Sequence, residues 1–236
     1  MKRELIVSLA AFVTKHWYEK VPYRWKVGNA AWSSLQTGFD HNAFGTDLAA
    51  INVALRQHLA HRWASADESE KIRLANWIVS DWGGIRRNSK EKILSYAKLA
   101  DLDRPSTPFE GVSSYSKILA VRDPERFAIF DARVAVSLNA IQLLIANAGL
   151  IETYQLLAFP IPQSRNSQVK RFTAAAFPSG LARRGFARLS KSAVYGTYLD
   201  LLRDVSSLSG KSVLELEMFL FAQAEDLGKR GEGLLG

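Results

Sequence analysis

The sequence predicts an all-α fold, and three observations support this prediction. Apolar residues recur at steps of three and four along almost the whole chain, which places them on one face of a helix. Alternation of apolar and polar residues over five or more positions, the pattern of a half-buried strand, is rare. Capping patterns and glycines stand at the ends of the periodic stretches. The chain contains no internal repeat and no low-complexity segment.

The first hundred residues contain four periodic stretches. We interpret the first as an amphipathic helix rather than a signal peptide, because Glu4 interrupts its basic start and its apolar run is short. The third stops at the breaker pair Gly83-Gly84, and the fourth begins at Ser89 with a capping pattern. The predicted helices cover residues 5–16, 48–59, 69–82 and 89–97.

The second half of the chain is read in the same way. Gly149 is a C-terminal stop signal, and Ser212 followed by Glu215 suits a capping box. The strand-like run VLELEMFLF follows this capping box, so we interpret it as helix. The predicted helices cover residues 114–121, 131–148, 191–205 and 211–226. The predicted loops are residues 103–111 and 158–171, and residues 228–236 are expected to form a loose tail.

Composition and charge narrow the class of partner. The 236 residues are 47% hydrophobic and 23% charged, as in an ordinary globular protein. The absence of cysteine excludes disulfides, thiolate metal sites and cysteine-held iron–sulfur clusters. No stretch approaches the roughly 18 apolar residues of a membrane span, so we expect a cytoplasmic protein without membrane contact. The net charge of +8 favours a polyanionic partner such as nucleic acid.

Three segments in the middle of the chain carry the candidate functional motifs. They are DWGGIRRNSKEK at residues 81–92, FEGVSSYSKILA at residues 109–120 and FAIFDARVAVSLNAI at residues 127–141. In the last segment an apolar run leads directly into Asp131, where a helical pattern begins. A carboxylate at this place either caps the helix or serves as the acidic group of an active site.

The order of helix, glycine-bearing turn, helix, short loop and aspartate at a helix start resembles the helix-hairpin-helix DNA glycosylases. It also resembles a bacterial branch described as 8-oxoguanine DNA glycosylase-like. The resemblance covers residues 109–141 and extends more loosely over 76–108. It implies a two-lobed helical bundle, with a hairpin lobe at about 69–150 and a second lobe formed by 1–68 and 151–236. It further implies a monomer that acts on double-stranded DNA in the nucleoid, and we expect no cofactor and no metal ion.

The resemblance also implies a role for each candidate residue. Asp131 would stabilise the positive charge that develops on the deoxyribose and would activate the attacking water. Lys117 would instead attack the sugar carbon and form a Schiff base, followed by strand cleavage. The flipped base needs an aromatic pocket, for which Trp82 and Tyr115 are candidates. The candidate DNA-binding residues are Gly111, Val112, Ser113, Arg133, Arg165, Asn166, Lys170 and Arg171.

Two positions depart from the resembled family. Ser113 stands where the second glycine of the turn is expected, which puts the close approach of a DNA phosphate in doubt. Lys117 lies two residues beyond the expected catalytic lysine, whose place is held by Tyr115, and two residues rotate a helix by about 200°. The sequence leaves Arg133 open between a salt bridge to nearby acids and a contact to the DNA backbone.

The function predicted from these motifs is excision of a modified base, either in repair or in defence against modified phage DNA. A non-catalytic helical module that binds nucleic acid is the alternative, and the two departures favour it. A helical scaffold for a protein partner is the third interpretation, in which Asp131 is only a helix cap. The sequence does not identify the base.

Overall fold

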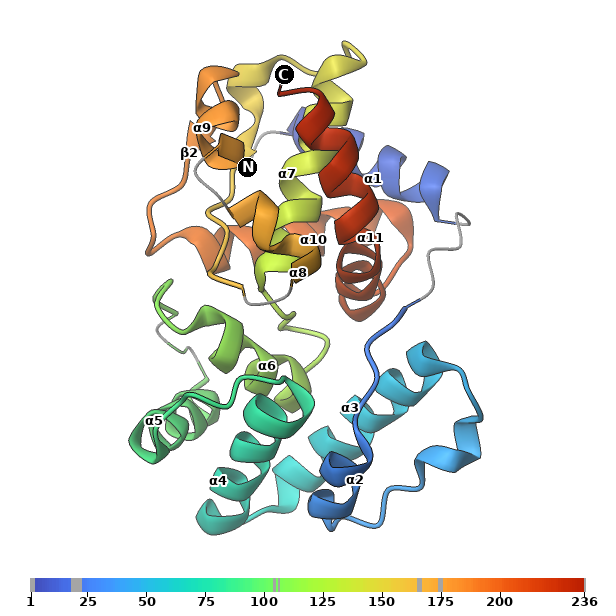
Figure 1. Cartoon of the computed structure of the whole chain (residues 1–236), viewed down its shortest axis with the longest axis vertical. Helices are drawn as coiled ribbons and strands as arrows, with labels where there is room; N and C mark the ends of the chain where they lie inside the picture. The colour runs from blue at the N-terminus through green and yellow to red at the C-terminus, as the bar shows by residue number, and fades with distance from the viewer. Residues whose placement is uncertain are drawn as a thin grey trace. The chain divides into compact units, whose positions relative to one another are not determined.

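The computed structural model describes residues 3–17, 23–103, 105, 107–164, 167–173 and 176–235. Helices form nearly all of their regular structure (Figure 1), so the prediction of an all-α fold is confirmed. The strands β1 (Leu157–Ala158) and β2 (Ala187–Arg188) add one short parallel pair.

The chain forms two compact units, each assembled from separate parts of the sequence. Unit 1 comprises residues 1–22, 108–110 and 130–236, and unit 2 comprises residues 23–107 and 111–129. These boundaries differ from those of the expected lobes. Residues 23–68 belong to the same unit as Gly111–Ser113, which we call the hairpin turn after the resembled family, and residues 130–150 belong to the other unit. Asp131 and Lys117 therefore lie in different units.

Unit 1 is built around α7 (Ala132–Asn147), which is buried over most of its surface. Of the described elements, α11 (Val213–Gly233) packs against it most extensively, and α1 (Arg3–His16) also packs on α7 and on α10 (Val194–Ser209). The approach of α11 to α7 depends on Gly231, where a Cβ would lie 2.9 Å from the Cβ of Ala140. The shorter elements of unit 1 are η3 (Thr153–Gln155), α8 (Ser167–Lys170), η4 (Arg171–Thr173) and α9 (Ala176–Arg183).

Two buried amide side chains of α7 form hydrogen bonds to the backbone of the segment that contains β1. Asn139 donates from Nδ2 to the carbonyl of Phe159 (2.8 Å) and accepts from the N–H of Phe159 (3.0 Å). Gln142 forms the same pair of hydrogen bonds with Leu157, at 2.9 and 2.8 Å. Buried backbone groups are costly when they lack partners. These amides therefore allow the segment to lie against the interior of unit 1.

Unit 2 packs its helices around α6 (Val112–Arg122), which contacts α3, α5 and η2. Its other elements are α2 (Asn29–Leu35), η1 (His41–Phe44), α3 (Leu48–Ser65), α4 (Glu68–Asn76), η2 (Trp77–Trp82) and α5 (Lys90–Asp101). The element η2 is a π-helix that continues α4, and the N–H of Gly83 closes it by bonding to the carbonyl of Ile78 (2.9 Å). Wide turns of this kind are frequent at functional sites.

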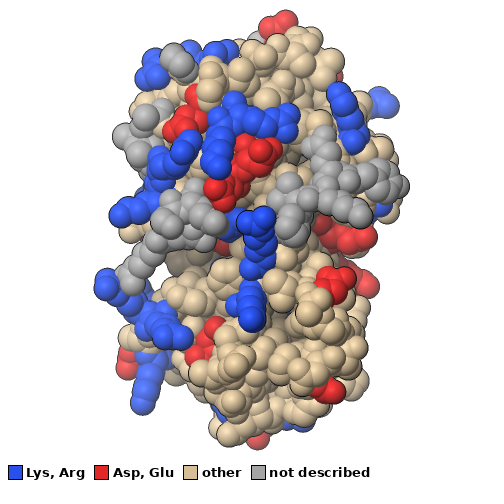
Figure 2. Space-filling view, turned by 45° about the vertical axis from the view of Figure 1, so that its right-hand side comes forward, with Lys and Arg blue, Asp and Glu red and all other residues tan. Residues whose placement is uncertain are grey.

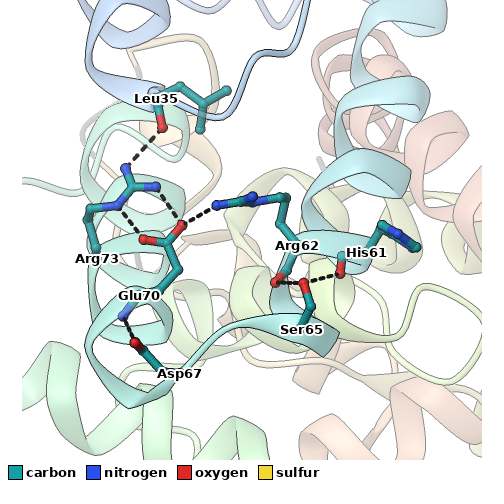
Figure 3. A network of polar contacts seen from close by, with 7 residues as sticks. All are labelled: Leu35, His61, Arg62, Ser65, Asp67, Glu70 and Arg73. Carbon is teal, nitrogen blue, oxygen red and sulfur yellow. Dashed lines mark hydrogen bonds and ion pairs between the residues drawn. The ribbon is translucent and has the colours of Figure 1, made fainter.

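A partly buried polar network joins α2, α3 and α4 (Figure 3). Glu70 accepts two hydrogen bonds from Arg73, each of 2.7 Å, and one from Arg62 at 3.1 Å. Arg73 also donates to the carbonyl of Leu35 at the end of α2 (2.9 Å). Asp67 caps α4 by accepting from the N–H of Glu70 (2.8 Å). The hydrogen bonds from Arg73 are the main reason that the pKa of Glu70 lies below its usual value.

The structure corrects several predicted elements. The expected loose tail is helical through Gly233, and Gly228 and Gly231 pack closely against residues of α7. The predicted loop 158–171 contains α8, and the predicted helix 69–82 divides into α4 and η2. The short helices α2 and α9 span only 7 and 8 residues, too few for a clear periodic pattern. Among the described residues, no helix has the length and apolar character needed to cross a bilayer.

Candidate functional site

Asp131 is the N-cap of α7 in unit 1. Its Oδ1 accepts hydrogen bonds from the N–H groups of Arg133 (2.9 Å) and Val134 (3.1 Å). Both bonds use the same oxygen, and Oδ2 has no hydrogen-bond partner among the residues that the structure describes. The side chain is half-buried, and the apolar residues 127–130 before it are buried. Asp131 is thus a fixed carboxylate with one oxygen left for further chemistry.

Arg133 joins α7 to α11 within unit 1. Its Nε donates to the carbonyl of Phe221 (3.0 Å), and its guanidinium lies 4.7 Å from the centre of the Phe221 ring. Nearby, the hydroxyl of Ser137 donates to the carbonyl of Leu220 (2.5 Å). The structure therefore gives Arg133 a helix-joining role that neither interpretation of the sequence included.

Gly111 opens α6 in the left-handed conformation, with φ 80° and ψ 4°. A Cβ at this position would meet the hydroxyl of Tyr96 and lie 3.0 Å from its Cζ. The helix has no side-chain cap, so its first N–H groups remain available to an acceptor from outside the helix. Val112 is buried, whereas Ser113 is half-buried and has a negative φ. The backbone therefore does not require the glycine that the resembled family has at Ser113.

Lys117 is buried in α6, with 5% of its surface exposed. Its Nζ donates to the carbonyl of Ser113 (2.8 Å), one turn earlier in the same helix. The amine therefore lies toward the hairpin end of α6. The stem packs against Gly83, where a Cβ would lie 2.7 Å from Cδ of Lys117. Unit 2 thus brings Lys117 together with Ser113 and with the end of η2.

Trp82 and Tyr115, the candidates for the base pocket, lie in the core of unit 2. Trp82 is 3% exposed, donates from Nε1 to Oδ1 of Asn52 (2.9 Å) and has the guanidinium of Arg56 5.2 Å from its ring centre. Tyr115 is 1% exposed, and its ring centre lies 6.0 Å from that of Tyr96. Neither ring has an exposed face on which a flipped base could stack.

The predicted basic track is only partly described. Arg165 and Asn166 lie outside the described residues. Lys170 is exposed, and Arg171 is ion-paired with Glu232 while it packs over Phe172. Figure 2 shows Lys and Arg side chains in several groups, with Asp and Glu side chains between them. The net positive charge of the chain is divided evenly between the two units.

Three residues near the hairpin make contacts that the sequence pattern does not reveal. Tyr96 fills the space beside Gly111, and Asn88 donates from Nδ2 to the hydroxyl of Ser114 (3.1 Å). Gly83 is predicted as a helix stop, but its close contact with Lys117 is visible only in the structure. Gly83-Gly84 is a local signal for a turn. Lys117, which contacts Gly83, lies more than thirty residues later in the sequence, so no local pattern indicates this contact.

Comparison with known proteins identifies no relative of this chain. No family model, no curated protein and no solved structure matches it. The described residues also contain no group of three or more His, Asp or Glu side chains placed to hold a metal ion. The residues that can carry chemistry are therefore Asp131 in unit 1 and, separately, Lys117 with the turn at Gly111 in unit 2.

Proposed function

We propose that the protein is a DNA glycosylase that excises a modified base, with Asp131 as its catalytic carboxylate. One observation carries the proposal. Oδ1 of Asp131 is fixed by two backbone N–H groups, whereas Oδ2 has no hydrogen-bond partner within the described part of the chain. A catalytic carboxylate has to be held in one orientation and has to keep an oxygen for the reacting atoms. Asp131 meets both requirements.

The chemistry needs only this carboxylate and a water molecule. As the bond between C1′ and the base nitrogen breaks, positive charge develops on the deoxyribose, and Oδ2 would stabilise it. The water oxygen then bonds to C1′, and the carboxylate accepts a proton from the water. The base leaves with the electron pair of the broken bond and takes up a proton. The products are a free base and an abasic site.

Binding to double-stranded DNA is supported by charge and by the hairpin turn. The net charge of +8 attracts the phosphate backbone. The first N–H groups of α6, which has no side-chain cap, would donate to a phosphate oxygen. The protein would act as a monomer in the cytoplasm, on DNA of the nucleoid.

Lys117 supports an additional step after base loss. Its Nζ lies at the hairpin end of α6, held by the carbonyl of Ser113. An amine there would attack C1′ of the abasic sugar in its aldehyde form and release water to give an imine. Strand cleavage would follow from that imine. This step is separate from base release by Asp131 and can be tested separately.

The substrate would be a base foreign to the unmodified genome. An oxidised base such as 8-oxoguanine would indicate repair, and a hypermodified base of phage DNA would indicate defence. Trp82 and Tyr115 are buried in the core of unit 2 and favour neither base, so the substrate alone separates the two roles. Activity on phage DNA without activity on oxidised host DNA would support defence, and the reverse would support repair.

The test of the proposed function is the count of abasic sites made by the wild type and by Asp131→Asn. Asparagine accepts the same two cap bonds through its side-chain oxygen, so the variant should keep its fold. We expect abasic sites on one class among oxidised, alkylated, deaminated and phage-modified DNAs, and a loss of at least about 100-fold in the variant. An aldehyde-reactive probe measures the product.

Asp47→Asn is the matched control, because Oδ1 of Asp47 caps α3 by accepting from two backbone N–H groups, as Oδ1 of Asp131 does in α7. Its activity should equal that of the wild type. Equal activity of Asp131→Asn and the wild type would remove Asp131 from the mechanism. If no DNA acquires abasic sites, the protein is not a glycosylase.

A non-catalytic module that binds nucleic acid is the second candidate. The observation that favours it is the burial of Trp82, Tyr115 and Lys117, each at most 5% exposed. This candidate predicts salt-sensitive DNA binding that is unchanged in Asp131→Asn, together with the absence of abasic sites. The same set of measurements therefore separates the two functions.

A further inference from the structure

The side chain of Tyr96 occupies the space beside the hairpin turn. It comes from α5, and its hydroxyl stands where a Cβ at Gly111 would be. Its ring lies 6.0 Å from the ring of Tyr115 in α6, at an angle of 59°. The ring is half-buried, and burial raises the pKa of its hydroxyl, so the hydroxyl stays neutral at physiological pH. Tyr96 thus links the middle of α5 to Gly111, the N-cap residue of α6.

Gly111 is the residue whose position sets the start of α6. Its carbonyl accepts from the N–H groups of Ser114 (2.8 Å) and Tyr115 (3.1 Å), which are the first hydrogen bonds of the helix. Glycine has more backbone freedom than any other residue type. Without a side chain packed beside it, a glycine in the left-handed conformation would therefore leave the turn free to move. Here Tyr96 closes one side of the turn, while Tyr115 holds the ring of Tyr96 from the other.

We infer that Tyr96 is a positioning residue for DNA binding, because it holds Gly111 and the first N–H groups of α6 where a backbone phosphate can reach them. This inference rests on the DNA contact of the proposed function and adds a residue to it. The phosphate is bound by backbone N–H groups, and Tyr96 acts on these groups through Gly111. Tyr96 does not touch the reacting sugar, so it should influence affinity and not the rate of base release once DNA is bound.

The experiment compares Tyr96→Ala and Tyr96→Phe in binding to a short fluorescein-labelled duplex, measured by anisotropy between about 50 and 200 mM salt. We expect Tyr96→Ala to bind about fivefold or more weakly, with a salt slope lower by about one phosphate contact. Tyr96→Phe keeps the ring against Tyr115 but removes the hydroxyl beside Gly111, so its affinity should lie between those of the wild type and Tyr96→Ala. At saturating DNA, the single-turnover rate of base release should be the same for all three proteins.

Leu94→Ala is the matched control for a general weakening of α5. Leu94 lies on the same helix and lines its groove with α4 instead of the turn. It should lower the melting temperature and leave DNA affinity unchanged. Circular dichroism confirms that each variant is folded before binding is measured.

Coupling to Gly111 provides a second measurement. In Gly111→Ala the new Cβ meets the Tyr96 hydroxyl, and this clash is absent when Tyr96→Ala is combined with it. The effect of Gly111→Ala on DNA affinity should therefore be smaller in the Tyr96→Ala background, a non-additivity that independent sites do not show.

The outcomes separate this inference from the proposed function. Wild-type affinity and salt slope in a folded Tyr96→Ala would overturn the role of Tyr96, even if the protein makes abasic sites. Weakened binding in Tyr96→Ala without any abasic sites in the wild type would support Tyr96 and overturn the glycosylase. A wild type that does not bind duplex DNA would overturn both.

Discussion

Lys117 reaches back along its own helix, and its Nζ donates to the carbonyl of Ser113, 2.8 Å away. Lys117 stands two residues beyond the expected lysine, so its Cα lies on nearly the opposite face of α6. Its hydrogen bond to Ser113, four residues earlier on the same face, moves the amine along the helix axis and not around it. The hydrogen bond to Ser113 places the amine one turn closer to the hairpin than the residue number suggests.

Lys117→Met should therefore separate two activities. Methionine keeps an apolar stem against Gly83 and removes the amine, so the free energy of unfolding should change by less than about 1.5 kcal/mol. Base release should continue, whereas borohydride trapping of the protein on abasic DNA should be lost. The control is Lys191→Met, which removes an exposed lysine paired with Glu110 and should leave trapping intact. Undiminished trapping in Lys117→Met would exclude this lysine as the nucleophile.

Asn139 is expected to be essential for the stability of unit 1. Asn139→Leu removes the partner of both backbone groups of Phe159 and leaves them buried without hydrogen bonds. The expected loss in the free energy of unfolding is about 2–4 kcal/mol, measured by chemical denaturation. Asn147→Leu, an exposed position at the end of α7, should change it by less than about 0.5 kcal/mol. Comparable losses in the two variants would contradict the assigned role of the buried amide.

Two helical glycines of unit 1 should respond to alanine in opposite directions. A Cβ at Gly228 would lie 2.6 Å from the Phe172 ring and 2.9 Å from Val136, so Gly228→Ala should destabilise by about 1–3 kcal/mol. Gly196 in α10 has nothing within 4 Å of its Cβ position, so Gly196→Ala should stabilise by up to about 1 kcal/mol. Thermal unfolding measures both. Stabilisation by Gly228→Ala would mean that α11 does not pack closely on its neighbours.

The Glu70 network predicts a specific pH dependence of stability. Arg73 holds the pKa of Glu70 below its usual 4.5 in the folded chain, so the unfolded chain takes up the proton first. The contribution is therefore fully present above about pH 4.5 and disappears as the pH falls through the lower folded value. Glu70→Gln should cost about 1 kcal/mol at pH 7, because the paired side chains are only partly exposed.

The difference between Glu70→Gln and the wild type should shrink toward zero at pH values well below 4.5. Chemical denaturation at a series of pH values measures it. Glu125→Gln, at an exposed carboxylate, should show no such dependence. A constant difference at every pH would show that the charge of Glu70 contributes nothing.

The sequence determined the helical class of the chain and the local chemistry of helix ends. Apolar spacing, capping residues and breaker glycines act within a few residues of one another, so they can be read without knowing the fold. Asp131 as a cap and the turn at Gly111 are of this kind. The helices α2 and α9 were not predicted, because stretches of 7 and 8 residues contain too few apolar positions to establish a helical period.

Only the tertiary structure decided which distant residues the candidate side chains contact. Trp82 pairs with Asn52, 30 positions away, and Arg133 bonds to Phe221, 88 positions away. Such contacts depend on packing between distant segments, which no local period encodes. The expectation of a loose C-terminal end was wrong for the same reason, because Gly228 and Gly231 lie where α11 meets Phe172 and α7. The sequence by itself thus determined where helices begin and end, and packing between distant segments decided which side chains are buried and which contacts they make.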